Sequence, residues 1–319
     1  MSPIKHLYWS VGRCILAKIA VELDKALSLR AATGAPGEAQ PRILAQGDGW
    51  TVADVICTSG RHDRPYEERH HNYSIALVTA GSFQYRGDAG CELMTPGSLM
   101  LGNAGQPFEC GHEHGEGDRC LAFWYTPDYF ERLAADAGAR KAEFPVLRLP
   151  ALRELSPLAA RATAAFQSPV GAWEELSLEL AVRVLKSVGR LSPAIAPVPP
   201  STLARVTRTV RMIESHPESS LMLTALARHA GLSPYHFLRV FERLTGLTPH
   251  QYILRARLRE AAARIAAEPA RVLDVALDCG FGDVSNFNRS FRAEFGVSPR
   301  TFRTDSSPWR CGSMHREGR

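Results

Sequence analysis

Ala276-Leu277-Asp278-Cys279-Gly280-Phe281 is the second copy of a pattern that first occurs as Ala227-Arg228-His229-Ala230-Gly231-Leu232-Ser233-Pro234. Each copy continues with matching aromatic, arginine and Gly-x-Thr/Ser-Pro positions, which are Phe237, Arg239, Phe241, Gly246, Thr248 and Pro249, then Phe287, Arg289, Phe291, Gly296, Ser298 and Pro299. A small residue on one helix and a glycine at the following turn are typical of a helix-turn-helix, because glycine adopts backbone angles that side chains resist. The repeat therefore predicts two helix-turn-helix units, around residues 225–252 and 274–302.

The second helix of each unit has the composition of a DNA-reading surface. Ser233 with Pro234, and Asp283 in the second copy, are suited to begin these helices. Phenylalanines at helical spacing predict one buried face. The opposite face then carries Tyr235, His236, Arg239 and Arg243 in the first unit, and Ser285, Asn288, Arg289 and Arg292 in the second. Arginine can bind guanine and asparagine can bind adenine through paired hydrogen bonds, so two such faces favour DNA binding over an ordinary solvated surface.

The segment from His250 to Ala267 predicts one long helix that connects the two units. Arginines at 255, 257, 259 and 264 alternate with apolar positions, which predicts a helix that is basic on its solvent-exposed side. A rigid connector would set the distance between two recognition helices, which must enter major grooves about 34 Å apart on one face of a duplex.

Residues 203–304 as a whole resemble the AraC/XylS family of bacterial transcription regulators. The resemblance implies a C-terminal all-α domain with two helix-turn-helix units joined by a long helix. It also implies base contacts from Tyr235, Leu238 and Arg239 in the first unit and from Val284, Ser285, Asn288 and Arg289 in the second. Leu238 and Val284 have no hydrogen-bonding group, so their contacts would be apolar, for example with a thymine methyl.

The charge distribution separates the chain into two halves. Residues 201–319 contain 18 Arg, no Lys and 11 acids, a net charge of +7, whereas residues 1–200 carry a net charge of −2. This predicts that only the C-terminal half meets phosphates. The seven cysteines are odd in number and irregularly spaced, which argues against a disulfide framework and favours a reducing cytoplasm.

The N-terminal half changes to short β-type runs separated by turn residues. The predicted strands are Trp50–Thr58, Tyr73–Thr79, Ser82–Arg86, Cys91–Met94, Ser98–Leu101 and Arg119–Tyr125, followed by helices at Asp128–Ala137, 152–167 and 173–190. Residues 74–99 resemble the cupin-like barrel that many AraC-family members carry as a sensor. The predicted fold class is therefore α+β multidomain, with a cupin-like β-barrel and helical hairpin before the all-α domain.

These patterns predict five segments. Residues 1–40 form an N-terminal extension, a candidate for disorder, in which Ile15–Leu23 has the pattern of an amphipathic helix and is too often interrupted by charge to span a membrane. Residues 41–192 form the sensor and dimerisation domain, 193–200 a Pro-rich linker, 201–304 the DNA-binding domain and 305–319 a tail. The stripe Leu176, Leu180, Val184, Val188 and Leu191 predicts either packing within its own domain or a dimer interface.

Two groups of side chains are candidates for a ligand site in the N-terminal half. His70, His71, His112 and His114 are candidates for effector binding. Cys110, His112, His114 and Cys120 alternate with small and polar residues and form a candidate zinc or copper site, although a polar loop at the barrel mouth is the favoured interpretation. The ligands expected of a metal-dependent cupin enzyme are replaced, with Ala76 or Leu77 where the acid belongs and Phe108 where a histidine belongs.

The sequence thus predicts a cytoplasmic transcription regulator, without catalytic residues or a cofactor, that binds double-stranded promoter DNA and senses a small-molecule effector. The resemblance implies a homodimer for many family members, and an activator would also contact RNA polymerase. Two alternatives stay open. One is a metal or redox sensor that uses Cys110, His112, His114 and Cys120. The other is a cupin enzyme fused to a DNA-targeting module.

Overall fold

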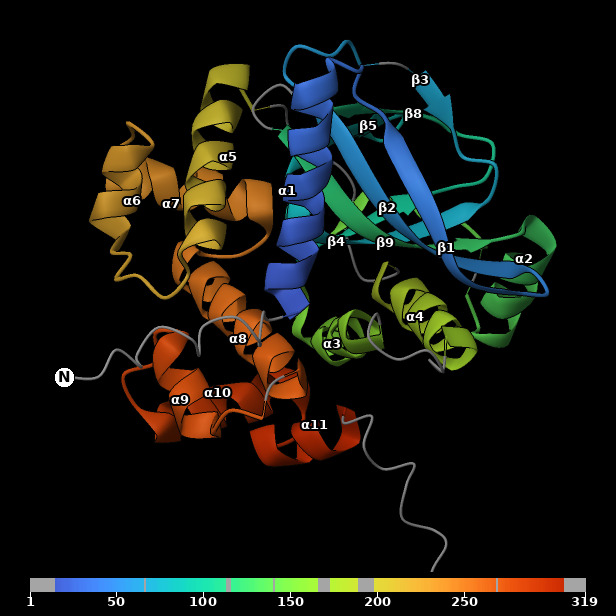
Figure 1. Ribbon diagram of the computed structural model, residues 1–319. Helices are drawn as coiled ribbons and strands as arrows, with labels where there is room; N and C mark the ends of the chain where they lie inside the picture. The colour runs from blue at the N-terminus through green and yellow to red at the C-terminus, as the bar shows by residue number, and fades with distance from the viewer. Residues whose placement is uncertain are drawn as a thin grey trace, which may run out of the picture.

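The chain folds into an N-terminal half built on β-sheets and a C-terminal half built only of helices (Figure 1). The computed structural model describes residues 15–65, 67–112, 116–139, 141–165, 173–188, 198–267 and 269–306. This architecture confirms the predicted α+β multidomain fold. No helix within these described ranges is both long and apolar enough to cross a membrane.

Two antiparallel sheets form the N-terminal barrel. The six-stranded sheet has the order β1-β2-β9-β4-β7-β10 and the four-stranded sheet has the order β3-β8-β5-β6. The strands are β1 (Ala39–Gly47), β2 (Trp50–Gly60), β3 (Glu67–Arg69), β4 (Tyr73–Gly81), β5 (Phe83–Gly87), β6 (Gly90–Met94), β7 (Leu99–Gly102), β8 (Pro107–Gly111), β9 (Glu116–Tyr125) and β10 (Arg148–Leu149). The sequence predicted six of them, and β1, β3, β8 and β10 are additional.

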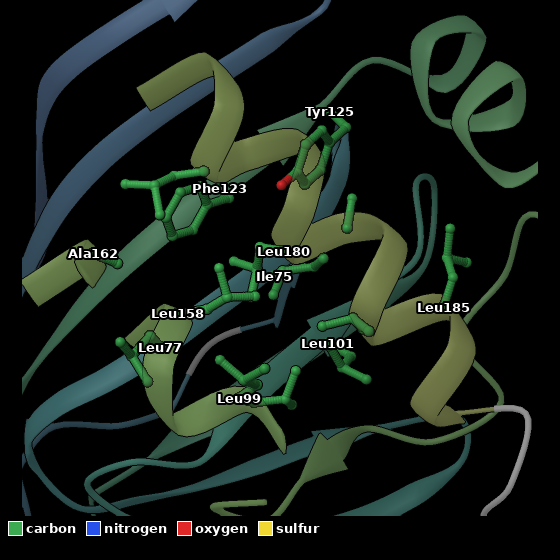
Figure 2. Close-up of a cluster of buried hydrophobic side chains, with 14 of the residues drawn as sticks. Ile75, Leu77, Leu99, Leu101, Phe123, Tyr125, Leu158, Ala162, Leu180 and Leu185 are labelled. Atoms are coloured by element: carbon green, nitrogen blue, oxygen red, sulfur yellow. The ribbon is translucent and has the colours of Figure 1, made fainter. Parts of the chain in front are cut away.

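The central strands of the six-stranded sheet bury both of their faces. On β4, Ile75 and Leu77 belong to the cluster under the helices, whereas Ala76 and Val78 belong to the cluster between the two sheets. Successive side chains of a strand point to opposite faces, so one strand serves two cores. Figure 2 shows the helix-side cluster, to which β4, β7, β9 and two helices contribute.

Helices α2 (Pro127–Asp136), α3 (Ser156–Ala165) and α4 (Trp173–Val188) cover that outer face. The stripe of α4, which the sequence assigned either to its own domain or to a dimer interface, is buried within its own half at Leu176, Leu180, Val184 and Val188. Leu191 lies outside the described residues. The Tyr125 hydroxyl also donates a hydrogen bond of 2.7 Å to the backbone carbonyl of Ser177 on α4. This stripe is therefore unavailable to a second copy of the chain.

Residues 15–33, assigned by sequence to an extension that was a candidate for disorder, form helix α1 (Ile15–Thr33). In Figure 1, α1 stands between the barrel and the C-terminal helices. It contacts β2, β9 and α8, and its Glu22 forms an ion pair of 2.6 Å with Arg119 of β9. Residues 1–14 of the predicted extension lie outside the described residues. So do residues 193–197 of the predicted linker and 307–319 of the predicted tail.

The C-terminal helices form two separate hydrophobic clusters joined along one long helix. The helices are α5 (Pro200–Ser215), α6 (Leu223–His229), α7 (Pro234–Thr245), α8 (Pro249–Ala267), α9 (Val272–Asp278), α10 (Val284–Phe295) and α11 (Pro299–Ser306). The first cluster contains Phe237, Phe241 and Tyr252, and the second contains Phe287 and Phe291. Since α8 contributes to both, it is the predicted connector of two helix-turn-helix units.

We predict that Gly280→Ala destabilises the second unit much more than Gly282→Ala. Gly280 has a left-handed φ of +83°, and an added Cβ would lie 2.6 Å from the backbone carbonyl oxygen of Glu218. Gly282 has open space around it, so it is a matched control. Left-handed strain alone costs roughly 1–3 kcal/mol, and the overlap adds to it. Urea unfolding should show a loss of at least about 2 kcal/mol for Gly280→Ala. Equal effects of the two variants would contradict this.

Candidate nucleic-acid interface and ligand sites

The recognition helix of the first unit, α7, begins and ends at residues suited to those positions. The Ser233 side chain accepts a hydrogen bond of 3.3 Å from the backbone N–H of His236, and Pro234 is the first helical residue. Gly246 ends the helix in the left-handed conformation, at φ +77°. These features confirm the predicted start of this helix and fix which of its side chains face solvent.

The outer face of α7 carries most of the predicted DNA-contacting residues in exposed positions. Tyr235 is 70% exposed, and the guanidinium of Arg239 lies 5.7 Å from the centre of its ring. His236 is exposed and Leu238 is partly exposed. Arg243 differs, since it is partly buried, with two guanidinium nitrogens that have no hydrogen-bond partner among the described residues. The structure thus presents Tyr235, His236, Leu238 and Arg239 together and turns Arg243 partly inward.

The recognition helix of the second unit, α10, has a stronger N-terminal cap. The Asp283 carboxylate accepts hydrogen bonds from the backbone N–H groups of Ser285 at 3.0 Å and Asn286 at 2.8 Å. These hydrogen bonds, from Asn286 first, lower the pKa of Asp283 below its usual value. The cap confirms the role predicted for Asp283 and orients the first turn of α10, which contains Val284 and Ser285, two of the predicted DNA-contacting residues.

A groove rich in arginine lies beside the first turns of α10. Its lining includes the predicted Val284, Asn288, Arg289 and Arg292, and no acidic residue is among the described residues that line it. Three more arginines, which sequence reasoning missed, line the same groove: Arg271, Arg300 and Arg303. Arg303 is tied to the backbone, because it donates hydrogen bonds to the carbonyls of Ile265 and Ala270. Arg271 and Arg300 are exposed. Arg271 lies just before α9 and Arg300 in the first turn of α11, and these positions next to the second helix-turn-helix unit could have identified them as groove residues from the sequence.

The arginines of α8, predicted to form a basic solvent-exposed side, are instead tied into the fold. Arg257 donates hydrogen bonds to the backbone carbonyls of Pro217, Ser219 and Gly280. Arg259 pairs with Glu214 at 2.6 Å and Arg264 with Asp278 at 2.8 Å. Arg255 binds Ala151 and Glu294. These arginines therefore hold the two units to each other and to the sensor half, which the local sequence pattern could not show.

The four histidines that were candidates for effector binding do not form one cluster in the described structure. His70 is buried, stacks on Phe108 at a ring distance of 4.0 Å and shares a hydrogen bond of 2.7 Å with the Tyr85 hydroxyl. Burial lowers the pKa of His70 to about 4, so it is a neutral core residue. His71 is exposed. His114 lies outside the described residues.

His112 belongs to a different group of buried polar side chains. Its Nε2 lies 2.6 Å from the Asp118 carboxylate, and Cys57 lies within reach of both. Burial would lower the pKa of His112, but the hydrogen bonds and charges of Asp118 and Cys57 raise it to about 10. The thiol sulfur of Cys120, a predicted metal ligand, lies 3.4 Å from a carboxylate oxygen of Asp118. Sequence reasoning missed Cys57 and Asp118, whose side chains meet only through strand pairing.

A mostly apolar cavity lies where the sensor half meets the DNA-binding half. Strands β4 and β7 and helices α3 and α4 line it from one side, and α8 and α10 from the other. Figure 2 labels six of the lining residues, which are Leu77, Leu99, Phe123, Leu158, Ala162 and Leu180. Arg255, Arg259 and Glu294 are its charged members, all from the DNA-binding half.

Polar contacts connect the two halves around this cavity. Glu294 of α10 accepts a hydrogen bond from Ser156 and lies 3.6 Å from Arg153. Near the other unit, Arg148 donates a hydrogen bond of 3.0 Å to the carbonyl of Thr245, the last residue of α7. Arg211 of α5 donates to the Ser82 hydroxyl at 3.2 Å. Both recognition helices are thus in contact with the sensor half.

Two capped recognition helices, the second beside an arginine-rich groove, together with a β-barrel sensor half, define a DNA-binding transcription regulator with a ligand-binding domain. Residues 226–305 match the model of a helix-turn-helix domain, and residues 52–177 match that of the AraC-like ligand binding domain. The chain belongs to the AraC/XylS family.

Several curated regulators are similar to this chain. The HTH-type transcriptional activator AarP of Providencia stuartii is 34% identical over 91 residues, which are 28% of this chain and 67% of AarP. The TetD protein of transposon Tn10 from Escherichia coli is 33% identical over 103 residues, 32% of this chain and 74% of TetD. The HTH-type transcriptional activator RhaS of Salmonella schwarzengrund is 29% identical over 204 residues, 60% of this chain and 71% of RhaS.

We predict that Arg289→Ala weakens binding to a specific operator by about 1–3 kcal/mol and relaxes the preference at one base position. Arg289 is exposed on the groove side of α10, and its guanidinium lies 3.3 Å from the Asn286 side chain, so little holds it away from DNA. Arg132→Ala, an exposed arginine on α2, is the matched control and should bind as the wild type does. Binding to randomised operators measures both. A loss that is uniform across all sequences would assign Arg289 to a phosphate contact instead.

Proposed function

We propose that this regulator reads promoter DNA with the exposed faces of α7 and α10 and that a small-molecule effector in its sensor half controls the arrangement of the two helices. The observation that carries the proposal is the arginine-rich groove beside α10, where Asn288, Arg289 and Arg292 lie next to Arg271 and Arg300. Such a surface provides both base-edge hydrogen bonds and phosphate neutralisation.

The contacts of the first unit follow the same logic. Tyr235, His236, Leu238 and Arg239 would lie against base edges or the adjoining backbone, and Val284 and Ser285 would do so in the second unit. Arg243 has a smaller part in this proposal, because it is partly buried.

The proposed division of labour assigns residues 41–192 to sensing and 201–304 to DNA binding. Support comes from the charge, +7 over residues 201–319 and −2 over residues 1–200, and from the start of a new helix at Pro200. Helix α1 is added to the sensing part, because its Leu23 is buried and its Glu22 pairs with Arg119. No reaction is proposed for the barrel.

The effector would occupy the cavity between the halves. Its walls are apolar side chains from both sides, so a small and mainly apolar molecule would fit it best. Because Glu294 and Arg255 line the cavity and also join α10 to α3 and α8, a ligand there would act on the contacts that hold α10. A ligand shifts such an equilibrium only by its different affinity for the two arrangements.

The proposal extends to activation of transcription in the cytoplasm, by a homodimer that contacts RNA polymerase. Its support is that AarP and RhaS are named transcriptional activators. The α4 stripe is excluded as the dimer contact, since it is buried within the chain. Sedimentation at several concentrations tests the dimer, and a promoter reporter tests activation against repression.

We predict that residues 198–306, produced alone, bind DNA without effector and that their affinity falls steeply with salt, whereas residues 15–188 do not bind. The reason is that arginines which neutralise phosphates release counterions, so log K decreases linearly with log salt. Fluorescence anisotropy at several salt concentrations measures the slope. A flat dependence, or affinity in the N-terminal piece, would contradict the assignment of DNA binding to α5–α11.

We also predict that Ala159→Phe abolishes the response to effector. Ala159 lines the cavity from α3, so a phenyl ring there would occupy the space of the ligand. Ala135→Phe, the same change at an exposed position of α2, is the matched control. A thermal-shift screen of small metabolites on the full chain identifies stabilising compounds, since a ligand at 100 times its Kd adds about 2.7 kcal/mol. The shift should vanish in Ala159→Phe and persist in Ala135→Phe. Persistence in both variants would place the effector elsewhere.

A further inference from the structure

The inside of the barrel contains a group of polar side chains that the proposed function does not use. Cys57 is on β2, Asp118 and Cys120 are on β9, and His112 directly follows β8. Cys57 and Asp118 are direct partners in the antiparallel pairing of β2 with β9. Asp118, Cys120 and Ala122 alternate along β9 on the side of the cluster between the sheets. Three elements therefore bring these groups to one place.

The donor atoms of this group are close enough for one metal ion. One ligand atom each from Cys57, His112 and Asp118 lies within 4.8 Å of the other two. Zinc binds thiolate sulfur at about 2.3 Å and imidazole nitrogen or carboxylate oxygen at about 2.0–2.2 Å, so donors around one tetrahedral zinc are roughly 3–4 Å apart. A small adjustment of side chains converts the observed group into a coordination shell.

The chemical types of the donors indicate which metal would be held. A thiolate, an imidazole and a carboxylate are a zinc set. The thiolate and the imidazole disfavour magnesium and calcium, which take oxygen ligands. The Cys120 thiol, 3.4 Å from the Asp118 carboxylate, is the nearest additional donor. His112 and Asp118 are both buried, with little of either side chain exposed, so these two donors are shielded from competing water.

We propose that Cys57, His112 and Asp118, with Cys120 beside them, form a zinc site inside the barrel. The sequence predicted Cys110, His112, His114 and Cys120 as candidate ligands. The proposed site keeps His112 and Cys120 and has Cys57 and Asp118 in place of Cys110 and His114. It is separate from the cavity between the halves, none of whose lining residues belongs to it. The metal joins β2, β9 and the end of β8.

The position of the site gives the metal a route to the DNA-binding half. Asp118 pairs directly with Gly81 in the register of β9 with β4, and an added Cβ on Gly81 would lie 2.6 Å from the Asp118 Cα. The next residue, Ser82, accepts the hydrogen bond from Arg211 of α5. On the opposite face of β9, Arg119 is paired with Glu22 of α1. Zinc binding would therefore stiffen β9. This strand contacts α1 directly and is linked to α5 through β4 and Ser82.

The test is a titration of the full-length, metal-stripped and reduced protein with Co²⁺, followed by displacement with Zn²⁺. Tetrahedral cobalt bound to a thiolate absorbs in the visible and gives a charge-transfer band in the near ultraviolet. The proposal requires saturation at one equivalent per chain and reversal by Zn²⁺. Cys57→Ser should lose the charge-transfer intensity contributed by that thiolate, and Asp118→Asn should weaken binding by at least about tenfold.

Cys91→Ser is the matched control, because Cys91 is an exposed cysteine on β6 outside the group, and it should titrate like the wild type. Circular dichroism and thermal unfolding of each variant show that it is folded before the titration. The proposal is overturned if the wild type shows no saturable cobalt spectrum. It is equally overturned if folded Cys57→Ser and Asp118→Asn both titrate like the wild type. A negative result leaves the DNA-binding and cavity proposals standing, since neither uses these residues.

Discussion

The need of the six-stranded sheet to bury both faces organises the rest of the molecule. The inner residues Ala76 and Ala122 are small and belong to the cluster between the sheets, whereas Ile75, Leu77 and Phe123 form a large apolar outer face. At about 25 cal/mol per Å² of apolar surface, that outer face cannot stay exposed. Helices α3 and α4 cover it, and α3 in turn contacts α8 and α10. The sensing core and the DNA-binding helices are thereby successive layers of one stack.

The arginines of the C-terminal half divide into two groups with different physical roles. Arg257 and Arg303 satisfy backbone carbonyls at turns, and Arg259 and Arg264 pair with acids, so these side chains are already committed within the fold. Arg239, Arg289, Arg292 and Arg300 are exposed on the recognition helices or beside them. Net charge counts both groups equally, but only the second is free to neutralise phosphate.

Contacts between the halves give the regulator a physical means of response. Arg148 reaches the end of α7, while Ser156 and Arg153 reach Glu294 on α10. Arg148 and Glu294 are buried and charged, and a hydrogen bond to a charged group contributes about 1.5–3 kcal/mol. A contact of this size is one that a ligand can shift, because couplings between sites are typically 1–3 kcal/mol. The proposed effector cavity and the proposed zinc site would be two different places from which such a shift begins.

Features encoded by residues close together in the chain were determined by the sequence alone. The two helix-turn-helix units, the caps at Ser233 and Asp283 and the exposed face of each recognition helix depend on helical periodicity and on local hydrogen bonds. Six strands of the barrel followed from alternation and turn residues. The short strands β3 and β10 were not predicted because too few residues carry the pattern. The amphipathic pattern of Ile15–Leu23 predicted part of α1, but the contacts of this helix with β9 and α8 depend on the tertiary structure.

Tertiary structure alone decided the features that join distant segments. Cys57 and Asp118 are 61 positions apart and meet through the register of β2 with β9. Glu294 of one half accepts a hydrogen bond from Ser156 of the other. Arg257 of α8 donates to a backbone carbonyl, and helical periodicity does not predict such a contact. His70 was read as a site residue because histidine is polar, but the fold stacks it on Phe108 and buries it. The physical reason is the same in each case. Burial and pairing of a side chain depend on which strands and helices become neighbours, and packing of the whole hydrophobic core determines those neighbours.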